Sequence, residues 1–328
     1  MVRRAFFAMS PETAHRAAQL ILGLPLPWAR IGGAVEDPAL ATDLAGIDLP
    51  NPIGLAAGFD KTCRHLDALG SLGFGYVVGG TITRAPRSGN PRPRIHRYPD
   101  ARSMTNAMGL PNPGAEAAAV SLSRLAVTSP RFASVADEEI ADAVATATLL
   151  APHVAGIELN ASCPNVSWGR DRDQEAHLRT LVSALVEAVE RPLFVKLPPI
   201  GSSKEADAVL ALAAVAQEAG AAGLTCGNTR LVGDERLAAT RGGLSGRALW
   251  PRTVETVAAV RTATADAFPI NACGGIFTAG DAVACLDAGA TTVQIYTSFI
   301  FEGPAVVGRL AAGVAAHRGR RGLVLPSP

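Results

Sequence analysis

The residues best suited to chemistry lie in one short segment, 160–165, with the sequence Asn-Ala-Ser-Cys-Pro-Asn. It follows an apolar run, residues 154–159, that predicts a buried strand. The carboxamides of Asn160 and Asn165 can pair with an amide or imide edge. The thiol of Cys163 can move a proton near neutral pH, since its ordinary pKa is roughly 8.5. A polar turn explains one asparagine and the proline, but not a thiol between two carboxamides. The segment therefore predicts a substrate site with an acid–base group, the alternative being that Cys163 only packs.

Lysine is scarce in this chain, and two of its positions indicate function. Only Lys61, Lys196 and Lys204 occur among the 30 basic residues, so arginine fills nearly every position that needs only a positive charge. A remaining lysine is favoured where a compact ammonium is required, because the broad guanidinium cannot replace it. Lys61 follows one apolar segment and Lys196 lies inside another, so we expect both at a functional site. The alternative is that both side chains only extend from strand ends to solvent.

The composition of the whole chain limits the classes of protein. The 328 residues are 48% hydrophobic and 5% aromatic, with a net charge of +1 and no separate basic tract, so nucleic acid is not expected as a partner. Five cysteines without a CxxC pair or metal-like spacing predict free thiols in a reducing cytoplasm, no metal site and no iron–sulfur relay. No apolar run approaches the roughly 20 residues of a membrane-spanning helix.

A repeated pattern from residue 50 onward predicts an α/β fold. Short apolar runs, turns with glycine or asparagine, and alanine- and leucine-rich helical stretches alternate along the chain. The predicted strands lie near 53–57, 76–80, 131–136, 156–160, 193–197, 222–227, 269–273 and 292–296. The predicted helices between them include 178–190, 204–218, 251–262 and 279–288. Eight such units are typical of a (β/α)8 TIM barrel. An open doubly wound sheet is the alternative, although no GxGxxG follows the first strand.

Residues 1–32 differ from the repeating part and predict an N-terminal helical segment ahead of a catalytic barrel at 33–328. A serine, a proline and an acid at 10–12 predict the start of a helix that ends near Leu22, and a short helix is expected near 27–31. These helices either cap the barrel or form an interfacial patch that contacts a membrane. With such a patch the cytoplasmic protein would attach peripherally to the inner face of the cell membrane.

The barrel would bring the candidate residues together, because active sites of such barrels lie at the C-terminal ends of the strands. Seven residues at predicted strand ends would meet there: Lys61, Thr81, Asn160, Lys196, Asn228, Gly274 and Tyr296. Glycine-rich turns at 242–246 and 271–276, with hydroxyl-bearing residues at 294–298, are suited to phosphate binding by backbone amides and hydroxyls. Together these turns predict a phosphate-bearing cofactor.

Several ordered motifs make this chain resemble the dihydroorotate dehydrogenases, the FMN enzymes of pyrimidine synthesis. The motifs cover almost the whole chain and occupy residues 51–61, 73–83, 89–94, 105–112, 242–246 and 293–300. The N-terminal helices and the motifs at 89–94 and 293–300 are similar to the membrane-associated class, which uses quinone. Residues 108–112 and 196–199 and the thiol of Cys163 are similar to the cytosolic class, since the membrane-associated enzymes usually have serine at that position.

The resemblance implies a role for each matching position. The substrate ring and its carboxylate would be held by Lys61, Asn106, Ala107, Met108, Gly109, Leu110, Asn160, Asn165, Asn228 and Thr229. FMN would be held by Ala57, Gly58, Lys61, Thr81, Asn160, Lys196, Gly227, Gly246, Gly275, Tyr296 and Thr297. Cys163 would take the C5 proton of dihydroorotate while N5 of FMN takes the C6 hydride. The product would be orotate, with quinone as the expected electron acceptor.

One departure from the family leaves the substrate open. The membrane-associated enzymes carry a glycine-rich turn with asparagine and lysine near the third strand, where this chain has Arg-Phe-Ala-Ser-Val-Ala-Asp-Glu at 131–138. One flavin contact is therefore lost or replaced. A paralogue that acts on another cyclic amide or enoate, in the manner of dihydropyrimidine dehydrogenase, is the first alternative. A non-catalytic barrel that serves as a membrane-attached scaffold is the second.

Overall fold

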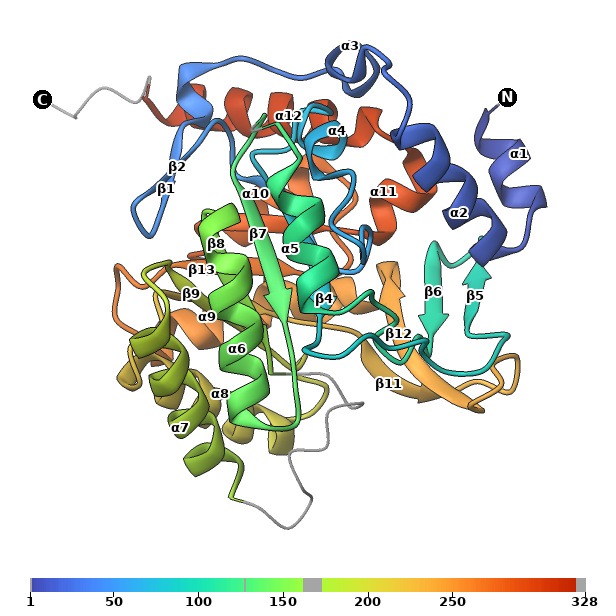
Figure 1. The fold of residues 1–328 in the computed structure, drawn as a ribbon. Coiled ribbons are helices and arrows are strands. Elements are labelled where there is room, and N and C mark those ends of the chain that lie inside the picture. Colours follow the sequence, from blue (N-terminus) through green and yellow to red (C-terminus); the bar gives the residue numbers. More distant parts are fainter. Residues whose placement is uncertain (1, 127, 162–172, 323–328) are drawn as a thin grey trace, which may run out of the picture.

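The centre of the molecule is a closed barrel of eight parallel strands (Figure 1). The computed structural model describes residues 2–126, 128–161 and 173–322. In chain order the barrel strands are β3 (Ile53–Leu55), β4 (Tyr76–Ile82), β7 (Arg131–Val135), β8 (Gly156–Asn160), β9 (Leu193–Leu197), β10 (Gly223–Cys226), β13 (Ile270–Cys273) and β14 (Thr292–Ile295). Each strand pairs with the next, and β14 pairs with β3 to close the ring. The predicted TIM barrel is confirmed, because all eight expected strands are present.

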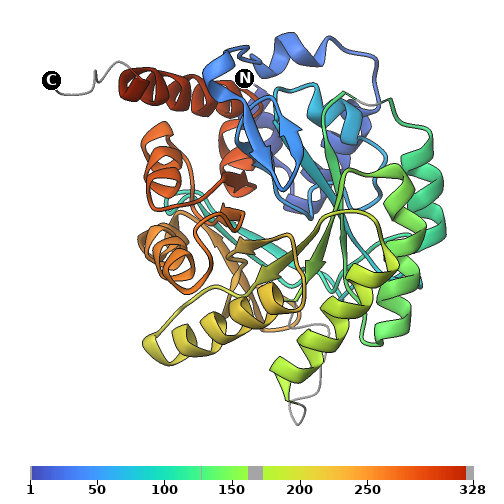
Figure 2. The same ribbon diagram turned by 90° about the vertical axis from the view of Figure 1, so that its left-hand side faces the viewer.

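Helices cover the outside of the barrel, as the end-on view in Figure 2 shows. They are α4 (Leu66–Gly70), α5 (Ala115–Ser123), α6 (Ile140–Leu150), α7 (Gln174–Ala188), α8 (Ser203–Glu218), α9 (Trp250–Ala263), α10 (Ala279–Asp287), α11 (Thr297–Glu302) and α12 (Ala305–Gly322). Side-chain caps define several starts: Asp173 accepts from the first turn of α7, and Thr278 with Asp281 forms a capping box on α10. Single turns of 3-10 helix complete the set at Pro38–Leu40, Ala151–His153 and Arg247–Leu249.

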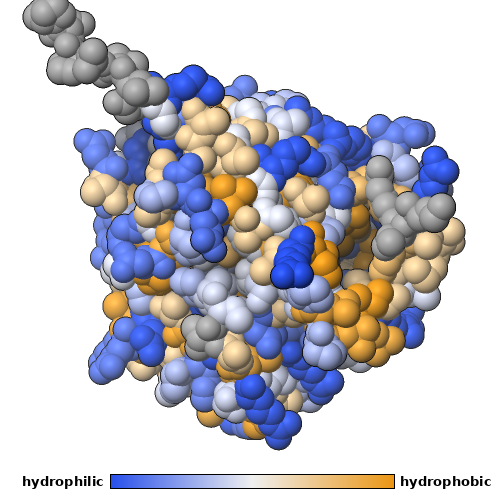
Figure 3. All heavy atoms as spheres, turned by 90° about the horizontal axis from the view of Figure 1, so that it is seen from above, coloured by the Kyte–Doolittle hydropathy of each residue, from blue (hydrophilic) through white to orange (hydrophobic). Residues whose placement is uncertain are grey.

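Three helices precede the barrel: α1 (Val2–Ala8), α2 (Pro11–Leu22) and α3 (Trp28–Gly32). The predicted start of α2 is confirmed, since the hydroxyl of Ser10 accepts a hydrogen bond from the backbone N–H of Thr13 at 3.3 Å. The helix α2 is tied to the barrel by Gln19, whose Nε2 donates to the carbonyl of Phe59 at 2.9 Å. Hydrophobic side chains gather on this side of the molecule in the view from above (Figure 3). No helix in the described ranges is long and apolar enough to cross a membrane.

A short hairpin closes the end of the barrel at which the strands begin. It consists of β1 (Thr42–Leu44) and β2 (Ile47–Leu49). Its residues Leu44 and Leu49 pack with Tyr76, Phe132 and Phe194, which form a cluster of buried side chains. Because three aromatic rings and the hairpin fill this end, we expect a ligand site at the opposite end, where the strands finish.

A four-stranded antiparallel sheet lies beside the barrel and was not predicted. Its order is β11 (Arg230–Gly233), β12 (Arg241–Gly246), β6 (Ser103–Asn106) and β5 (Ile95–Tyr98). The glycine-rich segment 242–246 is therefore most of a strand rather than a turn, and that prediction was wrong. In β12 the glycines allow close packing, because a Cβ on Gly242 would lie 2.6 Å from the carbonyl oxygen of Asn106.

One buried carboxylate, that of Asp234, ties this sheet together. The hydroxyls of Tyr98 and Thr105, on β5 and β6, both donate to Oδ2 of Asp234, which directly follows β11. Burial alone would raise the pKa of Asp234, but the hydrogen bonds from Thr105 and Tyr98 and the nearby Arg236 lower this pKa to about 2. The carboxylate thus stays ionised and holds three of the four strands in register.

Candidate active site

A cavity of about 370 Å³ opens where the barrel strands end, between the barrel, the antiparallel sheet and α2. Its volume lies in the range of small-molecule sites. Almost all of the described residues expected at the site line it, namely Ala57, Gly58, Lys61, Thr81, Asn106, Ala107, Met108, Gly109, Leu110, Asn160, Lys196, Asn228, Thr229, Gly246, Gly275, Tyr296 and Thr297. Gly227 does not line it and faces a small neighbouring pocket instead. Cys163 and Asn165 lie outside the described residues.

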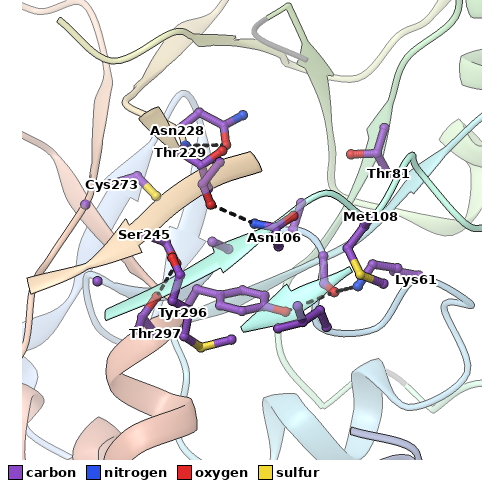
Figure 4. A pocket seen from close by; sticks show the side chains of 18 of the residues that line it. Lys61, Thr81, Asn106, Met108, Asn228, Thr229, Ser245, Cys273, Tyr296 and Thr297 are labelled. Atoms are coloured by element: carbon purple, nitrogen blue, oxygen red, sulfur yellow. Dashed lines mark hydrogen bonds between the residues drawn. The ribbon is translucent and has the colours of Figure 1, made fainter. Parts of the chain in front are cut away.

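Asparagine side chains form one wall of this cavity. Asn160 Nδ2 donates to Thr81 Oγ1 at 3.1 Å, and Asn228 Nδ2 donates to Asn160 Oδ1 at 3.4 Å. The backbone N–H of Thr229 is held by Asn228 Oδ1 at 2.7 Å, and Asn106 Nδ2 donates to the carbonyl of Gly243 at 3.4 Å (Figure 4). Such amide groups offer paired donors and acceptors to a planar ring that carries imide or amide edges.

The loop that follows Asn106 is held in an unusual backbone conformation at this wall. Gly109 and Leu110 both have positive φ, 72° and 54°, which is uncommon for leucine. Asn90 Nδ2 donates to the carbonyl of Ala107 at 3.0 Å, and Asn112 Nδ2 donates to that of Leu110 at 2.9 Å. Strain of this kind persists where the surroundings hold it, and it is enriched at ligand sites.

Lys61 contributes the cation on this side of the cavity, where its side chain points inward beside Met108 (Figure 4). Its Nζ donates to the carbonyl of Gly58. Burial, with a smaller contribution from Arg94, lowers the pKa of Lys61 to about 8, although Asp60 and Glu12 act in the opposite direction. A compact ammonium at this position suits a ligand carboxylate.

The pKa of Lys61 predicts how binding of an anionic ligand depends on pH. Because the ammonium loses its proton above about pH 8, the dissociation constant of a carboxylate ligand such as orotate should rise above that pH, by up to about tenfold per unit. Isothermal titration calorimetry with orotate, the ligand that the resemblance implies, would measure it. Lys61→Gln should bind weakly and without this dependence, whereas Cys163→Ala should keep it. An unchanged pH profile in Lys61→Gln would show that another group titrates.

Lys196 lies at the base of the cavity with Glu158 beneath it. The Nζ of Lys196 is 3.6 Å from Oε1 of Glu158 and 3.5 Å from Oε1 of Gln294. Burial alone would lower the pKa of Lys196, but the carboxylate of Glu158 raises this pKa above its ordinary value. The lysine is therefore an ammonium despite full burial, and it can stabilise negative charge on a ring above it.

The opposite end of the cavity has the character of a phosphate site. Ser245 and Thr297 join their hydroxyls at 3.1 Å (Figure 4), and the nearby Ser298 hydroxyl is buried without a hydrogen-bond partner among the described residues. Gly275 has a φ of 65°, and a Cβ there would lie 2.6 Å from the backbone nitrogen of Trp250. Buried hydroxyls without partners are costly unless a ligand satisfies them. These groups fit an anion that accepts hydrogen bonds.

Five residues at the mouth of the cavity were not expected at the site: Glu12, His15, Arg16, Arg92 and Arg94. The carboxylate of Glu12 pairs with two arginines. Its Oε1 lies 3.1 Å from Nε of Arg94, and its Oε2 lies 2.7 Å from Nε of Arg92. Burial, and then Lys61, lower the pKa of His15 to about 3, so its imidazole is neutral. Arg92 and Arg94 belong to the motif at 89–94. A cap on the barrel was one expectation for the N-terminal helices, but the sequence did not indicate which residues of α2 reach the cavity.

Comparison with known proteins places this site in a family. The sequence profile of the dihydroorotate dehydrogenases matches residues 39–317. The chain belongs to the dihydroorotate dehydrogenase family. Proteins of this family depend on flavin. Two relatives named dihydroorotate dehydrogenase (quinone) come from Kineococcus radiotolerans, 38% identical over 99% of this chain and 96% of the relative, and Verminephrobacter eiseniae, 36% identical over 97% and 95%.

Solved structures of the family have the same fold. The dihydroorotate dehydrogenase of Eimeria tenella in complex with ferulenol superposes with a TM-score of 0.84 at 28% identity, covering 96% of this chain and 93% of that one. Its ligand-free form superposes with a TM-score of 0.81. The resemblance to the quinone-using class is confirmed by the named relatives. The role of Cys163 as a base stays a prediction.

Proposed function

We propose that this chain oxidises dihydroorotate to orotate, uses FMN as its flavin and passes the electrons to a quinone. The observation that carries the proposal is the arrangement of one cavity in a dihydroorotate dehydrogenase fold. An amide wall with Lys61 lies on one side, the buried ammonium of Lys196 at the base, and hydroxyls with a tight glycine turn at the far end. The amide wall with Lys61 matches a cyclic imide that carries a carboxylate. The ammonium of Lys196 matches a flavin ring, and the hydroxyls with the glycine turn match a phosphate.

FMN would lie across the ends of the strands, held by the expected residues. Lys196 would face the pyrimidine edge of its ring, and Thr81 and Asn160 would contact the same edge. Gly246 at the end of β12, the turn at Gly275 and Thr297 would bind its phosphate. The unpaired hydroxyl of Ser298 supports this phosphate position. When bound, FMN supplies a two-electron acceptor. Near β7, where the glycine-rich turn is lost, Ser134 does not line the cavity, but its hydroxyl lies 2.9 Å from that of Thr81 and would hold this side chain towards the flavin.

The substrate ring would be held between the asparagines and the loop after β6. Asn106, Asn160, Asn228 and Thr229 would pair with the ring edges, and Lys61 with backbone groups of 107–110 would bind the carboxylate. Asn165 and the base Cys163 would complete the site from the segment outside the described residues. A thiol is more acidic than a serine hydroxyl, so Cys163 can accept the C5 proton without a strongly activating partner.

Residues 1–32 would form the quinone entrance, with 33–328 as the catalytic barrel. Glu12, His15 and Arg16 of α2 line the mouth of the cavity. The same helix and the loop after it expose Leu20 at 76% and Leu24 at 51% of their surface. An amphipathic helix with such residues can lie in the interface of a membrane. A cytoplasmic protein attached peripherally in this way could draw a lipid-soluble quinone from the membrane into the cavity.

Charges on this exposed face should reduce quinone turnover without affecting the first half of the reaction. Leu20→Glu and Leu24→Glu should each weaken vesicle binding by about tenfold or more, because each removes a leucine from the apolar contact. The rate of flavin bleaching by dihydroorotate should stay the same. The control is Val120→Glu on α5, which is 49% exposed elsewhere on the barrel. Equal quinone turnover in all three variants would show that α2 is only a cap.

The flavin itself provides the test of the proposed function. Purified protein should be yellow, and its absorbance should bleach within seconds to minutes of adding dihydroorotate but not dihydrouracil, which lacks the carboxylate for Lys61. Bleaching by dihydrouracil would favour the paralogue with another ring substrate. A colourless chain that takes up no added FMN would favour the non-catalytic scaffold.

A further inference from the structure

The barrel interior contains a carboxylate that no step of the proposed reaction uses. Glu158, on β8, is 1% exposed and does not line the cavity. Its Oε2 accepts hydrogen bonds from Thr225 Oγ1 at 2.9 Å and from Gln294 Nε2 at 3.1 Å. Its Oε1 accepts no hydrogen bond from the residues that the structure describes and lies 3.6 Å from Nζ of Lys196. A buried carboxylate is costly unless it is paired, so its place directly beneath Lys196 requires an explanation.

The groups around Glu158 leave Lys196 as its counter-ion. Thr225 is joined to Asn271, Asn271 to Thr292 and Thr292 to Tyr76, in a chain of hydrogen bonds between uncharged side chains. Burial raises the pKa of Tyr76, so this nearby titratable side chain is uncharged at neutral pH. Burial likewise raises the pKa of the Cys273 thiol, although Lys196 opposes this. Among the described residues, Glu158 and Lys196 therefore form a charge pair in otherwise neutral surroundings at the base of the cavity.

We propose that Glu158 is a positioning residue that fixes the ammonium of Lys196 and offsets its charge beneath the flavin. This inference rests on the proposed function, in which Lys196 faces the flavin ring. A lone cation at that place would strongly favour the negative charge that the ring acquires on reduction. The carboxylate next to it weakens this field. The bound flavin then has a lower affinity for electrons, which favours their onward transfer to the quinone.

Sulfite is a probe that separates this role from a purely structural one. The sulfur of sulfite donates its electron pair to form a bond to N5 of oxidised flavin, and the negative charge moves to the N1 and O2 edge that Lys196 would face. No other reagent is consumed, and removing sulfite reverses the step. The dissociation constant of the adduct therefore reports the field at that edge without dihydroorotate or quinone.

The decisive variant is Glu158→Gln, which keeps the shape and the acceptor for Thr225 but removes the charge. We expect sulfite to bind about tenfold more tightly or better, and the flavin midpoint potential to rise, in the holoprotein. Lys196→Met should weaken sulfite binding and lower the midpoint potential of the flavin. In the Lys196→Met background Glu158 has no counter-ion, and a buried carboxylate without one takes up a proton. There Glu158→Gln should therefore raise sulfite affinity much less than it does in the parent protein. Thr225→Val, which removes a hydrogen bond to Glu158 without a change of charge, should alter sulfite binding by less than threefold.

The outcomes distinguish this inference from the proposed function. Flavin content is measured first, and a parent protein without FMN would remove the proposed function itself. If parent and Glu158→Gln both carry FMN and their sulfite constants agree within twofold, the inference is overturned and Glu158 is only a structural partner of Lys196. If Glu158→Gln does not fold, the double variant Glu158→Gln/Lys196→Met, in which both side chains are neutral, is compared with Lys196→Met. If the double variant binds sulfite tenfold more tightly than Lys196→Met, Glu158 acts without Lys196 and the inference is overturned.

Discussion

Cys163→Ala is expected to bind FMN and orotate normally while flavin reduction by dihydroorotate slows by about 10²- to 10⁴-fold, the usual contribution of a positioned base. The reason is chemical, because the thiol of Cys163 is the most acidic side chain in the segment 160–165 and is therefore the most readily deprotonated near neutral pH. Rapid-mixing measurement of flavin bleaching gives the rate directly. In the parent protein this rate should rise with pH towards the apparent pKa of the thiol, since the thiolate is the base.

Two further variants make the result on Cys163 specific. Cys163→Ser should keep partial activity, with a profile moved to higher pH because a hydroxyl is the weaker acid. Cys285→Ala is the control, since burial raises the pKa of that thiol to about 12 and it lies on the outer helix α10. Reduction of Cys163→Ala within a few-fold of the parent would instead identify Cys163 as a packing residue, with the base elsewhere.

Gly275→Asp should give a colourless protein, because it places a carboxylate where the phosphate of FMN is proposed to bind. The matched variant is Gly275→Asn, which has the same shape and tolerates the φ of 65° equally well. Both side chains must displace the backbone of Trp250 by the same amount. FMN binding to the aspartate variant should therefore be about a hundredfold weaker than to the asparagine variant, from charge alone.

The measurement for the Gly275 pair is the FMN dissociation constant of flavin-free protein, alongside its unfolding transition. Gly319→Asp is the control for added charge, since a Cβ at that exposed position of α12 meets no atom within 4 Å. Equal FMN affinity in Gly275→Asp and Gly275→Asn would contradict the phosphate position between β13 and β14. A loss of folding in both would move the test to Ser298→Asp and Ser298→Asn.

The barrel could be predicted from the sequence because its strands are buried on both faces. Segments such as Gly156–Asn160 and Leu193–Leu197 are fully buried, so they appear as short continuous apolar runs. The antiparallel sheet could not be predicted in this way. Arg230–Gly233 is largely exposed, and Arg241–Gly246 has three glycines that favour a turn interpretation. Only their pairing in the folded chain makes them strands.

The candidate site was predictable to the extent that it lies at strand ends. Lys61, Asn160 and Lys196 follow or end apolar runs, and the barrel geometry brings such ends together. His15 and Glu12 reach the cavity from a helix that precedes the barrel, and no periodicity indicates where such a helix docks. Glu158 lies within an apolar strand, where a single acid gives no sign of its partner.

Two charged groups near the proposed substrate position, Asp234 and Lys61, respond to pH in different ranges. With a pKa of about 2, below its ordinary value, the carboxylate contributes stability above about pH 4 that is lost only as the pH falls through 2. The carboxylate that ties the sheet carrying Asn106 therefore keeps its charge at every pH above about 4. Lys61, with a pKa of about 8, titrates within that range. A change in orotate affinity between neutral pH and pH 8 therefore reports the protonation of Lys61, because the charge of Asp234 does not change in that range.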